Sequence, residues 1–234
     1  MTNFQAQEYI GRQLKDLTFE GWLTYVFDHP VGDHQEAWYW DIDRDWWEEE
    51  PADAIQFMTQ AFENAAVVFR PYSDAQLNQG LWFIASNSCS NHMFALLDAS
   101  VPWSAQKRCI CSIHQLYEQC FAKRCTAHLS HIDEPGAGPL NSICYMWWDI
   151  IPIYGKPNDP VWKEFDQDIL QVMESTLQLD SIACRESAFH GLGHWQHYYP
   201  ERVGEIIDRF SMAHRELPEK LEAYMLNAYT GYVL

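Results

Sequence analysis

The chain has 234 residues, 47% of them hydrophobic, so it can bury a substantial core, which argues against disorder. With 33 acidic against 15 basic residues, its formal charge of −18 disfavours binding to nucleic-acid phosphates or anionic membranes. We therefore expect no nucleic-acid or membrane partner, and the charge favours a protein partner with a basic surface.

The N-terminal sequence and the cysteines indicate the compartment. The first residues lack a basic segment followed by an apolar one, and no later run reaches about 18 apolar residues, so neither a signal peptide nor a membrane span is expected. Seven cysteines at irregular spacings are typical of reduced, buried thiols. The prediction is a cytoplasmic protein.

The first part of the chain shows helical periodicity in its long segments. A polar helix is expected from Gln5 to Asp16, and a capped helix from Thr18 to Asp28. Apolar residues repeat with helical period from Pro51 to Phe69, and Ser73 is placed to cap the next helix. Residues 51 to 87 therefore predict a helical hairpin.

Between these helices, the segment from Asp33 to Asp53 interleaves carboxylates with large aromatic side chains. Trp side chains often anchor interfaces, while surrounding carboxylates steer a basic partner toward the surface. The predicted partner-binding residues are Trp38, Trp40, Asp41, Asp43, Asp45, Trp46 and Trp47. The alternative is that the tryptophans cap one end of the helical core while the acids stay solvated.

The same segment contains three aspartates with the spacing that opens a calcium-binding loop, Asp41, Asp43 and Asp45. Such a loop needs Gly at its sixth position and Glu at its twelfth, where this chain has Trp46 and Ala52. Calcium binding is therefore not expected.

The middle of the chain continues the helical pattern. A long helix is expected from Trp103 to about Ala127, and the Pro, Gly and Asp cluster of residues 130 to 139 predicts a loop. Leu140 to Tyr154 is strongly apolar, and a further helix is expected to run to about Leu177. The last helix is expected after Pro218.

The stretch from Leu177 to Phe210 predicts two short antiparallel helices. Asp180 stands where a helix N-cap belongs, and one buried face is expected to comprise Cys184, Ala188, Gly191, Leu192 and Trp195. Pro200 fits the first turn of the second helix, because a backbone N–H at that position has no acceptor within the helix and its absence costs nothing.

In residues 177–210, Asp180, Arg185, Ala188 and the Gly191-Leu192-Gly193 sequence give the stretch a resemblance to a HEAT-like repeat, in particular the variant of phycobilisome lyase-like proteins. The resemblance implies helical hairpins that stack closely through small residues, and an Asp and Arg that bridge neighbouring repeats. It implies no catalytic residue.

These patterns together predict an all-α protein whose residues 1–234 form a single all-helical domain. The expected architecture is a stack of antiparallel helical hairpins, either a HEAT-like or ARM-type α-solenoid or a compact α-α superhelix. At least about 60% of the chain should be helical, well above the usual third of a globular protein.

One set of side chains has the spacing of metal ligands on a helix: His190, His194 and His197, with Glu186 one turn earlier. The helical period places all four on a stripe that points away from the core. Three interpretations stay open: a zinc site, a pH-sensitive or partner-contacting face, and plain surface. The sequence lacks the HExxH motif, and no metal or cofactor is predicted.

The sequence contains no phosphate-binding glycine loop and no GxSxG motif, so an enzyme is not the favoured class. The leading hypothesis is a non-catalytic, cytoplasmic interaction module that presents a helical-repeat surface with an acidic and aromatic patch. One alternative is an acidic immunity or inhibitor protein that neutralises a basic toxin or nuclease. Another is a small enzyme or cofactor-handling protein that uses His190, His194 and His197.

Overall fold

The computed structural model describes residues 11–32 and 36–233. Helices of all types hold 63% of these residues, which confirms the prediction of an all-α fold. The α-helices are α1 (Phe19–Phe27), α2 (Pro51–Glu63), α3 (Ala65–Val68), α4 (Asp74–Ala85), α5 (Trp103–Leu116), α6 (Ala122–Arg124), α7 (Pro139–Ile150), α8 (Lys163–Leu177), α9 (Ile182–Trp195), α10 (Pro200–Ala213) and α11 (Glu219–Thr230).

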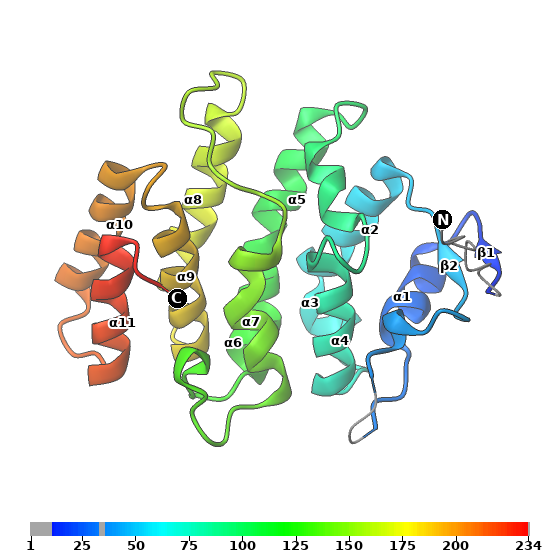
Figure 1. Cartoon of the computed structure of the whole chain (residues 1–234), viewed down its shortest axis with the longest axis horizontal. Helices are drawn as coiled ribbons and strands as arrows, with labels where there is room; N and C mark the ends of the chain where they lie inside the picture. The colour runs from blue at the N-terminus through cyan, green and yellow to red at the C-terminus, as the bar shows by residue number, and fades with distance from the viewer. Residues whose placement is uncertain (1–10, 33–35, 234) are drawn as a thin grey trace, which may run out of the picture.

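The main helices stand side by side along the longest axis of the molecule (Figure 1). Packing contacts join α1 to α4, α4 to α7, α7 to α9 and α9 to α11, which makes one layer. The second layer joins α2, α5, α8 and α10 in the same way. Successive long helices after α1 therefore alternate between two layers, and the buried apolar side chains form one cluster between and within them.

The caps explain most helix starts. The hydroxyl of Thr18 accepts a hydrogen bond from the backbone of Gly21 at the start of α1, and Ser73 and Gln76 form a capping box at the start of α4. Prolines occupy the first position of α2, α7 and α10. In the predicted 103–127 helix, a π-helical turn at Tyr117–Phe121 separates α5 from the short α6.

Small residues allow α7 and α9 to approach closely, as the sequence indicates. A Cβ atom on Gly191 would lie 2.7 Å from Cγ of Trp148 in α7, and Ala188 is fully buried. On another side of α9, a Cβ atom on Gly193 would lie 2.3 Å from the side chain of Val233. These positions have no room for larger side chains.

Three local predictions are wrong. The N-cap of α9 is Ser181, whose hydroxyl accepts from the Cys184 backbone, while the Asp180 side chain is fully exposed. Arg185 lies 3.7 Å from Asp180 of its own segment and donates to the carbonyl of Leu177, so the implied bridge between repeats is not formed by this pair.

The third concerns the predicted helix from Gln5 to Asp16. Residues up to 10 lie outside the described residues, and Gln13–Leu14 forms the short strand β1, parallel to β2 (Trp46–Trp47). The predicted pairing of residues 181–195 with 200–211 is present as a contact between α9 and α10, but α9 packs more extensively on α7, α8 and α11.

Candidate functional site

The residues that the sequence predicts for a functional site lie in two regions. The first is the segment between α1 and α2. Within it, Trp40 is 53% exposed and Ile42 is 54% exposed, and both neighbouring carboxylates, Asp41 and Asp43, are exposed. We call these four residues the acidic–aromatic surface. Of the predicted segment, residues 33–35 lie outside the described residues.

Internal hydrogen bonds hold this surface in place. The guanidinium of Arg44 donates to the carbonyl of Tyr39 at 3.0 Å and to the hydroxyl of Tyr25 in α1 at 3.2 Å. The backbone N–H of Asp43 donates to the Asp41 carboxylate at 2.9 Å, which closes a tight turn. The turn therefore presents Trp40 and Ile42 without a large loss of conformational freedom on binding.

The other tryptophans of the segment are less exposed than Trp40, and the prediction of partner binding is wrong for Trp47, which is buried. Trp47 is 7% exposed and packs on Phe57, because the hydrophobic core gains from burying so large a ring. Trp38 is half-buried, and its ring stacks on His29 with centroids 4.0 Å apart. Trp46 is half-buried in β2. Trp47 and Trp38 thus pack on the hydrophobic core, as the alternative interpretation expects, whereas Trp46 stays partly exposed.

Asp45 is likewise bound within the chain. Its carboxylate accepts from the backbone N–H and from the guanidinium of Arg12, both at 2.9 Å, and thereby fastens β1 beside β2. These contacts with Arg12 hold the pKa of Asp45 below its usual value. Asp45 is therefore paired within the chain, whereas Trp40, Asp41 and Asp43 are the exposed members of the predicted set.

The second region is α9, where the prediction of an outward-facing histidine stripe is wrong. Glu186 is 0% exposed and His190 is 4% exposed, because α7, α8 and α11 cover three sides of this helix. Eleven of its fourteen residues are buried. Of the predicted stripe, only His197 is fully on the surface, and His194 is intermediate.

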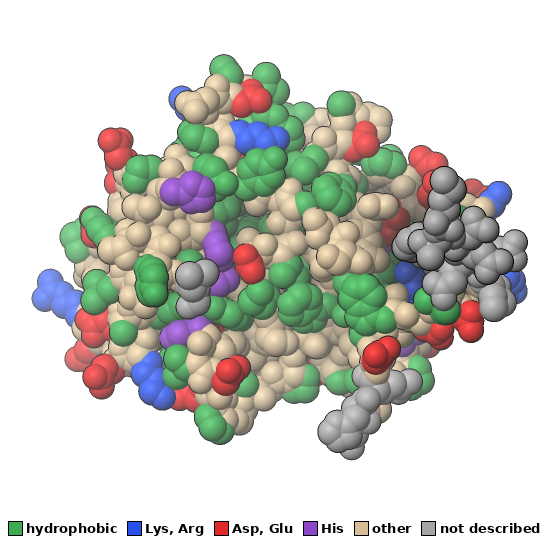
Figure 2. All heavy atoms as spheres, viewed as in Figure 1, with side chains coloured by type: hydrophobic (Ala, Val, Ile, Leu, Met, Phe, Trp, Pro, Cys, Tyr) green, Lys and Arg blue, Asp and Glu red, His purple; other side chains and the backbone are tan. Residues whose placement is uncertain are grey.

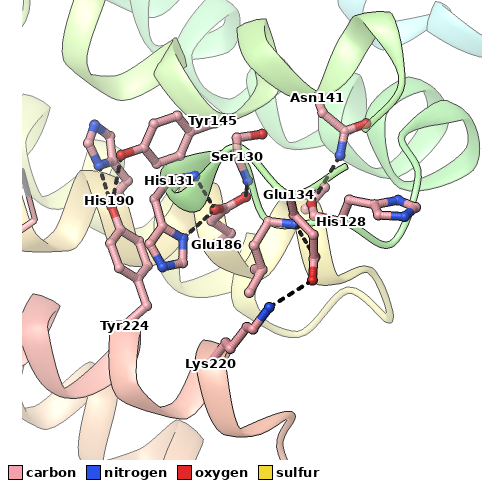
Figure 3. A network of polar contacts seen from close by, with 12 residues as sticks. His128, Ser130, His131, Glu134, Asn141, Tyr145, Glu186, His190, Lys220 and Tyr224 are labelled. Atoms are coloured by element: carbon pink, nitrogen blue, oxygen red, sulfur yellow. Dashed lines mark hydrogen bonds and ion pairs between the residues drawn. The ribbon is translucent and has the colours of Figure 1, made fainter. Parts of the chain in front are cut away.

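Glu186 binds the short 3-10 helix η4 (Ser130–Ile132) in the connection between α6 and α7. Its two carboxylate oxygens accept from the backbone N–H groups of Ser130 and His131, each at 2.9 Å, and one oxygen also contacts Nδ1 of His131 at 2.6 Å (Figure 3). A buried carboxylate needs such donors. Glu186 therefore orients the His131 ring.

Hydrogen bonds also hold the rest of the connection between α6 and α7 in place. The amide of Asn141 bonds to the backbone of Thr126 and to the carbonyl of His128, and Glu134 accepts from Lys220 of α11 at 3.2 Å (Figure 3). The connection is thus tied to α7 at one point and to α11 at another.

A phenol links this network to His190. The Tyr224 ring of α11 stacks on His131, with centroids 4.0 Å apart, and its hydroxyl lies 2.6 Å from Nδ1 of His190 and 3.2 Å from the hydroxyl of Tyr145 (Figure 3). Burial, with the charges of His194 and His131, lowers the pKa of His190 to about 3, and burial raises the pKa of Tyr224. At neutral pH both rings are therefore neutral.

The other ring nitrogen of His190 faces two further groups. Its Nε2 atom is 3.2 Å from Nε2 of His194, which in turn is 3.4 Å from a carboxylate oxygen of Asp149 in α7. The three ligand atoms lie within 4.8 Å of one another. In Figure 2, histidine side chains form a column on the left half of the visible face, with an acidic side chain beside the middle one.

The structure therefore does not keep the four residues of the predicted histidine stripe together. His190 and His194 come together, while Glu186 is bound to η4 and the exposed His197 ring packs on Tyr198. Asp149 was missed because it lies on another helix. The sequence did contain a signal that α9 is buried on most sides. Only two residues of Ile182–Trp195 carry full charge, so this helix lacks the polar face of a surface helix.

No protein-family model, curated protein or solved structure matches this chain. Within residues 11–32 and 36–233, every helix is too short or too polar to cross a membrane. The seven cysteines are free thiols.

Proposed function

We propose that this chain is a non-catalytic, cytoplasmic protein-interaction module that binds a basic protein partner through the acidic–aromatic surface. The observation that carries the proposal is the pair Trp40 and Ile42, each more than half exposed and each beside an exposed carboxylate, on a turn held by Arg44. The alternation of helices between two layers supports a HEAT-like, solenoid arrangement as the scaffold.

Physical chemistry assigns different roles to the two kinds of side chain. An exposed indole and an exposed aliphatic side chain gain free energy when a partner covers them, so they would set the lifetime of a complex. The carboxylates of Asp41 and Asp43, in a chain of formal charge −18, would accelerate the approach of a basic partner and act mainly on the association rate.

The same surface and charge support a second candidate, an acidic immunity or inhibitor protein that neutralises a basic toxin or nuclease. This function requires one tight complex of equal stoichiometry, whereas an adaptor would bind more weakly to several partners. Identification of the bound protein distinguishes the two.

The test uses the wild-type chain and two surface variants as bait in a lysate of the source organism, with bound proteins identified by mass spectrometry. We expect Trp40→Ser with Ile42→Ser to lose a basic partner that the wild type retains. The purified partner is then studied by stopped-flow mixing at two salt concentrations. We expect Asp41→Asn with Asp43→Asn to slow association, most strongly at low salt.

A matched control changes the net charge equally at the other end of the stack. Asp208→Asn with Glu222→Gln alters two exposed acids of α10 and α11. If this control slowed association as much as the Asp41 and Asp43 variant, overall charge would be responsible and the acidic–aromatic surface would not be the docking site. Unchanged binding by the Trp40 and Ile42 variant would also refute the proposal.

A further inference from the structure

We propose that His190, His194 and Asp149 bind one divalent transition-metal ion of the zinc class. This site is separate from the acidic–aromatic surface and does not depend on the function proposed there. Two histidines four residues apart on one helix can hold zinc together, and a carboxylate is a common third ligand.

The spacing of the three groups fits a tetrahedral ion. Ligand atoms at zinc bond lengths of about 2.0 to 2.2 Å lie about 3.3 to 3.5 Å apart at tetrahedral angles. The two measured edges are 3.2 Å, between the Nε2 atoms of His190 and His194, and 3.4 Å, between Nε2 of His194 and Asp149. The third pair, His190 and Asp149, has its ligand atoms within 4.8 Å, so these two groups need only approach each other to complete the site.

Hydrogen bonding alone accounts less well for this arrangement. A single N–H on His194 would face two acceptors, at 3.2 and 3.4 Å, whereas the usual N–H···O distance is about 2.9 to 3.0 Å. The first separation is at the upper end of the hydrogen-bond range and the second is beyond it, and both suit two ligands of one ion. The metal therefore explains the distances as a set.

The surroundings of His190 resemble the second shell of a zinc ligand. A histidine that binds metal through one nitrogen usually donates its other N–H to an oxygen. Here Nδ1 of His190 lies 2.6 Å from the hydroxyl of Tyr224, so Nδ1–H can donate to that oxygen and direct the Nε2 lone pair outward. Tyr224 is itself positioned by the stacked His131, which Glu186 holds.

The site is open to ions from solution. The side chains of His194 and Asp149 are 34% and 39% exposed, so an ion can reach the two outer ligands before it meets the buried His190. Three protein ligands leave a fourth tetrahedral position for water or for an anionic ligand. The site therefore differs from a closed structural zinc site.

The test is metal binding by the untagged, full-length chain after EDTA treatment and removal of the chelator. Zn²⁺ is titrated in competition with a chromophoric chelator, and Co²⁺ is added separately to record its visible absorption. We expect one tight ion per chain and the intense visible band of tetrahedral cobalt. His194→Ala or Asp149→Asn should weaken zinc binding by at least about 100-fold, and Tyr224→Phe by about 10- to 100-fold.

His197→Ala is the matched control, because His197 is an exposed histidine three residues beyond His194. We expect it to bind zinc as the wild type does. Circular dichroism of each metal-free variant shows whether it is folded. Absence of a tight ion in the wild type, or equal affinity in folded His194→Ala and wild type, would overturn the proposal. So would a loss in His197→Ala as large as that in His194→Ala.

Discussion

The close contact between α7 and α9 gives a prediction with an internal reference: Gly191→Ala should destabilise the protein relative to Gly204→Ala. A Cβ atom at residue 191 would lie 2.7 Å from Cγ and 2.8 Å from Cβ of Trp148, which is 3% exposed. Carbon atoms pack at about 3.5 to 4.0 Å, so the helices must separate by about 1 Å.

Two effects of opposite sign set the magnitude. Overpacking a core typically costs about 1 to 3 kcal/mol, while alanine in place of glycine inside a helix gains about 1 kcal/mol. Gly204→Ala in α10 should show only the gain in helix propensity. A Cβ there would be 3.6 Å from the Tyr229 hydroxyl, which is an ordinary contact. The stability difference between the two variants should therefore be about 1 to 3 kcal/mol.

The assay is urea unfolding followed by circular dichroism, with EDTA present so that bound metal contributes nothing. Thermal midpoints provide a second measurement, and the two variants should differ by about 2 to 12 °C in a chain of this size. Equal stabilisation by both substitutions would refute the reasoning, because it would show that a methyl group at residue 191 meets no resistance from Trp148.

Three further predictions concern single residues. Glu186→Gln should lower the free energy of unfolding by about 1 to 3 kcal/mol in urea titrations, because an amide NH₂ replaces one of the oxygens that accept from η4; an unchanged midpoint would contradict this. Burial raises the pKa of Asp166, so the protonated carboxyl stabilises the fold below about pH 4, and this contribution is lost as pH rises through the folded pKa. The stability of Asp166→Asn relative to wild type should therefore increase between pH 4.5 and 7, measured by urea midpoints, and the opposite trend would refute it. With a maleimide reagent, the exposed Cys111 should react first, whereas buried Cys109, whose pKa burial raises to about 12, should react only on unfolding; mass spectrometry of Cys111→Ser should show the fast phase lost.

The fold class could be predicted because apolar residues recur with helical period in every long segment. Ser73 and Pro200 also indicated helix starts correctly, since a cap or a first-turn proline acts within a few residues. The start of α9 was wrong by one residue because Asp180 and Ser181 are both good N-cap residues, and their backbone conformation decides between them.

The candidate sites were predicted less completely, because they depend on contacts between distant parts of the chain. Periodicity places Glu186 opposite the apolar face of α9, but a helix covered on three sides buries polar residues as well. Asp149 and Tyr224 join His190 only through helix packing, across 41 and 34 residues of sequence respectively (190 − 149 and 224 − 190). Likewise, the spacing of Asp45 gave no sign of its pairing with Arg12.

The position of α11 at the end of the stack ties the accessibility of one nitrogen of His190, Nδ1, to local opening of the fold. This helix packs mainly on α9 and α10, so it can separate without exposing the core around α2 and α4. Such an opening removes the Tyr224 ring from His190 and His131 and admits water to a histidine that is otherwise almost fully covered. Replacement of the Tyr224 hydroxyl by water at Nδ1 of His190 therefore depends on the fraying of α11, which is an equilibrium separate from global unfolding, whereas Nε2 of the same ring faces the partly exposed His194.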